Sequence, residues 1–207
     1  MPIIFHQNIN SSVSVAVWRI TETEEFLFNT ISLTNSDKEA LRALALPKRR
    51  LERLACRHAL AFLMQTDSVE LYYSPVGAPQ SANGFVSLSH SGIYAAAAFS
   101  TKTPIGIDIE QISDRTDRLY ARFMSSNSPP LSEKTATTPH LSAYMWCAKE
   151  AAYKLYARGD IDFVQAITIE AEQQRGVVAL PQGGSLPFAI FHTIVENMMI
   201  CTAIEQK

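Results

Sequence analysis

The pattern of hydrophobic and polar positions changes period several times along the chain. Residues 12–20, SVSVAVWRI, alternate in polarity and are rich in β-branched side chains, which predicts a strand. Apolar side chains recur at helical spacing through LPKRRLERLACRHALAFLM, which predicts an amphipathic helix. A helix before it is expected to begin near Ser36, a candidate N-cap. Four further strands are predicted at VELYYS, FVSLSHS, YAAAAFS and PIGIDIE.

The second half shows the same mixture of periods. A helix is predicted from about residue 141 to 158, followed by three strands, FVQAITIEAE, GVVAL and FAIFHTIVENMMICTAI. Residues 125–139 form a polar, proline-rich loop and are expected to be the most mobile segment. Because helices and strands mix without regular βαβ alternation, the pattern favours an α+β fold. Both halves run strand, helix, strands, without a repeat at the residue level.

Composition narrows the class of protein. At 207 residues, 47% of them hydrophobic, the chain can bury a sizeable core. A net charge of −2 argues against non-specific binding to nucleic acid or anionic membrane. Three scattered cysteines indicate reduced thiols, and the first twenty residues lack the pattern of a signal peptide. We therefore expect a cytoplasmic protein.

The segment GIDIE places two acids two residues apart. On a strand, Asp108 and Glu110 project to the same side, where two carboxylates repel each other unless a cation or a proton lies between them. Oxygen ligands of this kind suit Mg²⁺. The alternative is a strand end with two solvated acids, which is the commoner outcome for such a pair taken alone.

A second motif, WCAKEAAYKLYAR, carries Trp146, Glu150 and Lys154 on one stripe of the predicted helix. In one interpretation, Glu150 and Lys154 form a surface ion pair beside a packed tryptophan. In the other, Glu150 is a third oxygen ligand of the metal ion. In the second interpretation Lys149 and Lys154 contact a phosphate. The spacing alone does not decide between them.

Two polar features in the first half suit an anion. SLSHSG sets His90 between Ser89 and Ser91 where the chain turns, so hydroxyls, imidazole and turn N–H groups could cradle a phosphate. The other interpretation is a neutral, hydrogen-bonded histidine. The basic run PKRRLERLACR places Arg50, Arg53 and Arg57 on one face of the predicted helix. This face could bind a phosphate, bind an acidic partner, or simply be solvated.

Taken in order, the basic helix, SLSHS, GIDIE and WCAKEAAYK resemble the 4′-phosphopantetheinyl transferase superfamily, of the longer Sfp type. The resemblance runs from about Pro47 to Phe163. It implies transfer of 4′-phosphopantetheine from coenzyme A to a serine of an apo acyl or peptidyl carrier protein, as in fatty acid biosynthesis, with release of 3′,5′-ADP.

The resemblance also implies an architecture. Two similar α+β halves, residues 1–103 and 104–207, would be related by pseudo-twofold symmetry, with the active site in the cleft between them. The first half would contribute the basic helix and the SLSHS strand, and the second GIDIE and the WCAKEAAYK helix. Such an arrangement is compatible with a monomer.

Residue roles follow from the same resemblance. The Mg²⁺ ligands would be Asp108, Glu110 and Glu150, and Glu150 would also act as general base for the carrier serine. The contacts with the coenzyme would come from Arg50, Arg57, Ser89, His90 and Lys154. Of these, Lys154 would contact the pyrophosphate, and Arg50 and Arg57 the 3′-phosphate, with Arg49 or Arg53 as substitutes. Trp146 is expected to pack the helix.

Two departures from the family pattern bear on ligand and partner. The chain has Gly77-Ala78-Pro79 where the family often has Gly-Lys-Pro, and the loss of that lysine is expected to weaken or reroute a contact with a coenzyme phosphate. Phe123 leads into MSSNSPPLSEK, where the family usually has Phe-x-x-x-Glu in the region that meets the carrier protein.

Three alternative functions are compatible with parts of this pattern. They are a non-catalytic binder of coenzyme A or of a carrier protein, a Mg²⁺-dependent hydrolase of nucleotide-like diphosphates, and a serine hydrolase built on Ser89 or Ser91 with His90. The last is disfavoured because adjacent residues on a strand point apart.

Overall fold

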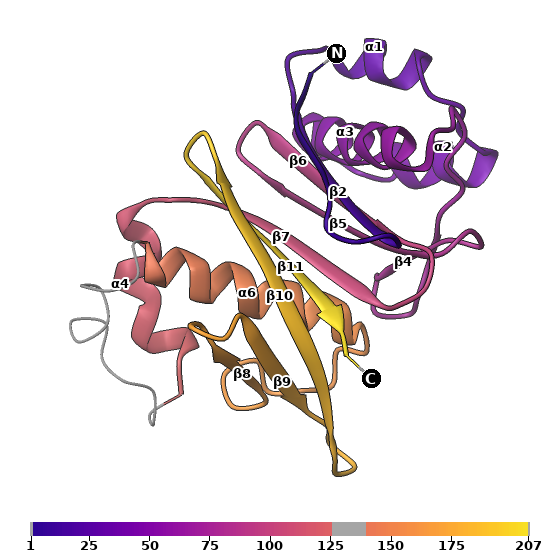
Figure 1. Cartoon of the computed structure of the whole chain (residues 1–207). Helices are drawn as coiled ribbons and strands as arrows, with labels where there is room; N and C mark the ends of the chain where they lie inside the picture. The colour runs from indigo at the N-terminus through magenta and orange to yellow at the C-terminus, as the bar shows by residue number, and fades with distance from the viewer. Residues whose placement is uncertain (1, 126–139, 207) are drawn as a thin grey trace. The chain divides into compact units, whose positions relative to one another are not determined.

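The computed structural model describes residues 2–125 and 140–206 and divides the chain into two compact units, Met1–Pro104 and Ile105–Lys207. Each unit combines α-helices with an antiparallel sheet, which confirms the predicted α+β class (Figure 1). The proline-rich segment, from residue 126 to 139, lies outside the described residues. Among those described, no helix has both the length and the apolar character required to cross a bilayer.

The sheet of the first unit has the strand order β1-β2-β6-β5. Its strands are β1 (Ile3–Asn8), β2 (Val13–Arg19), β5 (Phe85–Ser91) and β6 (Tyr94–Ser100). Strands β2, β5 and β6 were predicted from the sequence, and β5 and β6 form the expected hairpin. The predicted strand VELYYS is wrong in extent, because only β3 (Tyr72–Tyr73) is a strand, paired with β4 (Pro79–Gln80).

The long helix of this unit is α3 (Pro47–Met64), as the apolar spacing predicted. Leu54, Ala55 and Ala59 pack in one hydrophobic cluster with Ala95 and Ala97 of β6. Before it come α1 (Glu24–Asn29) and α2 (Asn35–Arg42). Helix α2 begins two residues earlier than expected, because Thr34 forms a capping box with Asp37.

The sheet of the second unit has the order β7-β11-β10-β9-β8. Its strands are β7 (Ile105–Gln111), β8 (Ile167–Glu170), β9 (Arg175–Ala179), β10 (Ser185–Val195) and β11 (Met198–Glu205). The closing hydrophobic run, predicted as one strand, is the β10–β11 hairpin, which reverses at Glu196 with a φ of 54°. The helices are α4 (Asp114–Phe123) and α6 (Leu141–Tyr156), and α6 packs on β7 and β11 (Figure 1).

Gly106 allows β7 and α6 to approach closely. A Cβ atom built at Gly106 would lie 2.0 Å from the carbonyl oxygen of Ala151 in α6, closer than any side chain tolerates. Gly106 therefore faces α6, and because strand residues alternate, Asp108 and Glu110 face the same side. The glycine of GIDIE thus brings the α6 backbone near the two acids that follow it.

Candidate active site

Asp108 and Lys154 join the two motifs. The Nζ atom of Lys154, on α6, donates a hydrogen bond of 2.7 Å to Oδ1 of Asp108, on β7. The Asp108 side chain is buried, and a charge-assisted bond at this length is the stronger kind. Lys154 thus pairs with an acid of the other motif, and its positive charge also lowers the pKa of Glu150 on its own helix.

Glu110 and Glu150 complete a group of three acids. Burial raises the pKa of Glu150, and the negative charges of Asp108 and Glu110 raise it further, while Lys154 acts in the opposite direction. Burial, and after it the negative charge of Asp108, likewise raise the pKa of Glu110. The positive charges of Arg115 and Lys154 lower it. Each acid is therefore within electrostatic reach of the others.

The donor set has the chemistry that Mg²⁺ requires. Three mutually repelling carboxylates are balanced by two cations, Lys154 and the exposed Arg115, whose Nη1 atom lies 3.5 Å from Oε1 of Glu110. Oxygen donors with surplus negative charge suit a hard divalent cation. As the side chains are placed, however, no three His, Cys, Asp or Glu residues in the described part of the chain are arranged to hold a metal ion.

Trp146 has two kinds of contact on the same helix. Its ring packs against Phe123 and Phe163, with centroids 5.1 and 5.7 Å away, as expected for a packing residue. In addition, a hydrogen bond from its side chain to Glu110 lowers the pKa of that acid and so favours the carboxylate. This second contact was not predicted from the sequence, although the i, i+4 spacing to Glu150 placed Trp146 on the correct face of the helix.

Lys149 does not lie among these polar groups. Its side chain is 1% exposed, and Nζ donates to the carbonyl oxygens of Val164 and Ile167 at 3.0 and 2.9 Å. Burial lowers the pKa of Lys149 to about 8, with Asp162 acting in the opposite direction. The interpretation of Lys149 as a phosphate contact is wrong, because its ammonium group fixes the loop between α6 and β8.

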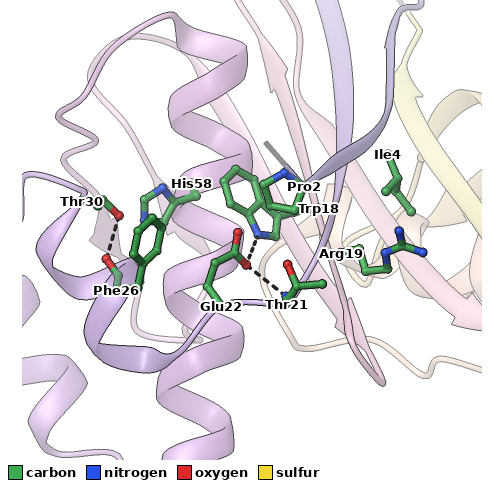
Figure 2. A pocket seen from close by; sticks show the side chains of 9 residues that line it. All are labelled: Pro2, Ile4, Trp18, Arg19, Thr21, Glu22, Phe26, Thr30 and His58. Atoms are coloured by element: carbon green, nitrogen blue, oxygen red, sulfur yellow. Dashed lines mark hydrogen bonds between the residues drawn. The ribbon is translucent and has the colours of Figure 1, made fainter.

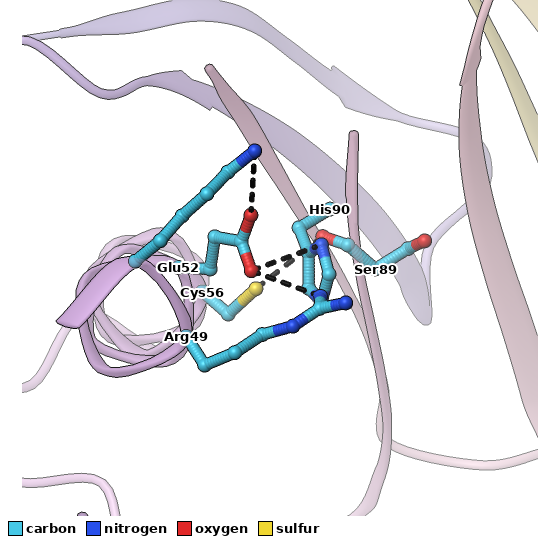
Figure 3. Close-up of polar contacts among 6 residues, drawn as sticks. Arg49, Glu52, Cys56, Ser89 and His90 are labelled. Carbon is cyan, nitrogen blue, oxygen red and sulfur yellow. Dashed lines mark hydrogen bonds and ion pairs between the residues drawn. The ribbon is translucent and has the colours of Figure 1, made fainter. Parts of the chain in front are cut away.

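His90 and the start of α3 form a second polar cluster, in the first unit (Figure 3). Nη1 of Arg49 lies 3.1 Å from Nε2 of His90 and donates 3.0 Å to Oε2 of Glu52. The Nδ1 atom of His90 is 3.6 Å from the same carboxylate oxygen. Ser89 is buried, and its carbonyl oxygen accepts a hydrogen bond from Sγ of Cys56.

The other predicted arginines of α3 have partners within the first unit. Arg57 is 1% exposed, forms an ion pair with Asp37 and donates to the carbonyl of Val69, so it holds α2 against α3. Arg50 donates 2.6 Å to Glu24 and 2.7 Å to the carbonyl of Leu44. Both side chains stabilise the packing of neighbouring segments. Arg53 lies over the ring of Tyr73, 5.1 Å from its centroid.

A cavity of about 600 Å³ in the first unit was not anticipated from the sequence (Figure 2). Its walls include Trp18, Phe26 and His58. The carboxylate of Glu22 accepts bonds from Nε1 of Trp18 and the N–H of Thr21, and His58 Nε2 lies 2.9 Å from the carbonyl oxygen of Leu27. These polar groups therefore form hydrogen bonds within the wall of the cavity.

The second unit matches a known family. Residues 104–195, slightly less than half of the chain, match the model of the 4′-phosphopantetheinyl transferase superfamily. This part of the chain is similar to that superfamily. The matched range contains Asp108, Glu110, Glu150 and Lys154, so the hydrogen-bonded β7–α6 junction lies inside it. No curated protein matches the chain. The superfamily supports a transferase of phosphopantetheine groups, with coenzyme A and a carrier protein as its general partners.

Proposed function

We propose that the protein transfers 4′-phosphopantetheine from coenzyme A to a serine of an apo acyl or peptidyl carrier protein, with Mg²⁺ as cofactor. The observation that carries the proposal is the bond between Lys154 and Asp108, which joins the two acidic motifs of the superfamily domain in one place. Glu110 and Glu150 lie within electrostatic reach of this pair.

In the proposed reaction, the serine Oγ attacks the phosphorus that bears the pantetheine arm. A new P–O bond forms, the bond to the second phosphate breaks, and 3′,5′-ADP leaves with the electron pair. Glu150 accepts the serine proton as general base. Lys154 offsets the negative charge that develops on the leaving group.

Asp108, Glu110 and Glu150 are the residues that would hold Mg²⁺. When bound, the ion would neutralise the pyrophosphate and relieve the repulsion among the three carboxylates. Lys154 already supplies one positive charge to Asp108, so the chain itself provides part of this neutralisation.

The partner and setting of the protein are part of the same proposal. The carrier we favour is an acyl carrier protein of fatty acid synthesis, which this protein would modify as a monomer in the cytoplasm. Cys56, Cys147 and Cys201 are free and buried, which suits a reducing compartment. The predicted sharing of one active site by two pseudo-symmetric halves stays a prediction.

The experiment that tests the reaction follows coenzyme A and 3′,5′-ADP by chromatography, with and without an apo carrier protein. We expect 3′,5′-ADP to accumulate only when the carrier is present, in proportion to the carrier modified. Release of 3′,5′-ADP without any carrier would replace the proposal with hydrolysis of the diphosphate. Binding of coenzyme A without turnover on any of several unrelated carriers would replace it with a non-catalytic binder.

A further inference from the structure

Glu52 is a buried acid near the start of the basic helix α3 (Figure 3). Its side chain is 4% exposed, although its neighbours on α3, Lys48 and Arg49, are 70% and 55% exposed. The Nζ atom of Lys48 lies 3.8 Å from Oε1 of Glu52, while Oε2 accepts the hydrogen bond of Arg49 and faces His90. A buried carboxylate is costly unless it is paired, so these three contacts account for its presence.

The contacts also fix the orientation of His90. A guanidinium group only donates, so Nε2 of His90 accepts from Arg49, which puts the ring proton of the neutral imidazole on Nδ1, facing Glu52. Strand β5 is in turn held to α3 by the bond from Sγ of Cys56 to the carbonyl of Ser89. Glu52 thus contacts Arg49 and His90 from the buried side. The side chain of Arg49 is still 55% exposed and that of His90 36% exposed.

We propose that Glu52 is a positioning residue, which holds Arg49 and His90 together as a phosphate-binding pair. The inference rests on the proposed function, because it takes the phosphate to be one of coenzyme A. It assigns the arginine contact to Arg49 in place of Arg50 and Arg57, whose guanidinium groups bind Glu24 and Asp37.

The sign of the effect separates positioning from simple charge. Neutralising Glu52 makes the cluster more positive, so a purely electrostatic role predicts tighter binding of an anion to a Glu52→Gln variant. A positioning role predicts weaker binding, since Arg49 and His90 lose the group that orients them. We expect the loss to be about tenfold, equivalent to one charge-assisted hydrogen bond.

The experiment is calorimetric titration of coenzyme A and of 3′-dephospho-coenzyme A into the full chain. The variants are Glu52→Gln, Arg49→Ala and the double variant, with Glu39→Gln, an exposed acid on α2, as the control for charge. We expect about tenfold weaker binding of coenzyme A by Glu52→Gln, no change in the control, and a double variant no weaker than Arg49→Ala. Equal losses with both ligands would identify the pyrophosphate as the group bound, and a loss with coenzyme A alone would identify the 3′-phosphate.

Unchanged or tighter binding by Glu52→Gln, or a loss that adds to that of Arg49→Ala, would overturn the inference while leaving the proposed function intact. If the unaltered chain binds neither ligand, the proposed function fails and the inference falls with it. Glu52→Asp keeps the charge but withdraws the carboxylate by one methylene group, and it serves if Glu52→Gln does not fold. It too should weaken binding, and unchanged affinity in Glu52→Asp would contradict positioning.

Discussion

At the scale of single residues, the charge balance at the β7–α6 junction governs the site. Burial and mutual repulsion raise the pKa values of Glu110 and Glu150, so the carboxylates are held close at a cost to folding. Lys154 offsets part of that cost through Asp108. Groups that are unfavourable for stability yet gathered at one place are typical of functional sites.

Replacing one of these acids should separate activity from stability. We expect Glu150→Gln to abolish phosphopantetheine transfer and to leave the thermal unfolding temperature equal or slightly higher, because one repelling charge is gone. Transfer assays and thermal denaturation of the same preparation check this, with Glu172→Gln, an exposed acid, as control. Retained transfer, or a marked fall in unfolding temperature relative to the control, would contradict the assignment of Glu150.

Lys149 gives a pH dependence with a definite sign. Its pKa falls from 10.5 in the unfolded chain to about 8 in the folded one, so between these values the unfolded state binds more protons. The penalty for burying the charge is therefore fully present below about pH 8 and is relieved as the pH rises to 10.5.

Comparison with Lys149→Met isolates this group. The free energy of unfolding of the unaltered protein, minus that of the variant, should rise by up to about 3 kcal/mol across the window, as measured by urea unfolding at a series of pH values. A difference that stays flat would mean that the carbonyls of Val164 and Ile167 keep the ammonium group charged throughout.

At the scale of elements, the site depends on how closely α6 approaches β7. Gly106 has no Cβ, and the carbonyl of Ala151 and the N–H of Leu155 occupy the space that one would need. Backbone atoms cannot move aside as the end of a flexible side chain can. The distance between the strand that carries Asp108 and the helix that carries Lys154 is thus set by one glycine.

A methyl group at this position should be costly. We expect Gly106→Ala to lower the free energy of unfolding by about 3 kcal/mol or more, and to reduce transfer by displacing α6 from β7. Gly183→Ala, where a Cβ would meet nothing within 4 Å but φ is +91°, is the matched control and should lose only about 1–2 kcal/mol to backbone strain. Equal losses at both glycines in chemical denaturation would contradict the close-approach argument.

The elements that the sequence predicted correctly are those with a strong period. Alternation revealed β2 and β5, and helical spacing revealed α3, because regular spacing marks the side of an element that packs on the core. Short or polar elements escaped. Helix α1 has only six residues, and half of the residues of α4 (DRTDRLYARF) are charged.

The residues of the site were predictable to different degrees. The same-side projection of Asp108 and Glu110 follows from alternation on a strand, and Gly106 facing α6 supports it. The partners of Arg50, Arg57 and Lys149 could not be predicted, because Glu24, Asp37 and the carbonyl of Val164 come near them only through tertiary folding. For a charged residue, periodicity shows the face but not the partner.

At the scale of the whole molecule, the site residues proposed from sequence and structure divide between the two units. Arg49, Glu52 and His90 belong to the first unit, and the acids with Lys154 belong to the second. The superfamily match covers only the second, so the coenzyme contacts proposed for the first rest on its own cluster of charges. Tests of binding and of transfer therefore address different units.

The measurement that tests the central claim most directly is the intact mass of an apo acyl carrier protein after incubation with this protein, coenzyme A and Mg²⁺. The account predicts a gain of one phosphopantetheine group per carrier, lost when a chelator is added or when Glu150→Gln replaces the unaltered chain, and kept with Glu172→Gln. An unmodified carrier, across several unrelated carrier proteins and with coenzyme A bound, would contradict the account, as would modification that proceeds undiminished in the presence of the chelator.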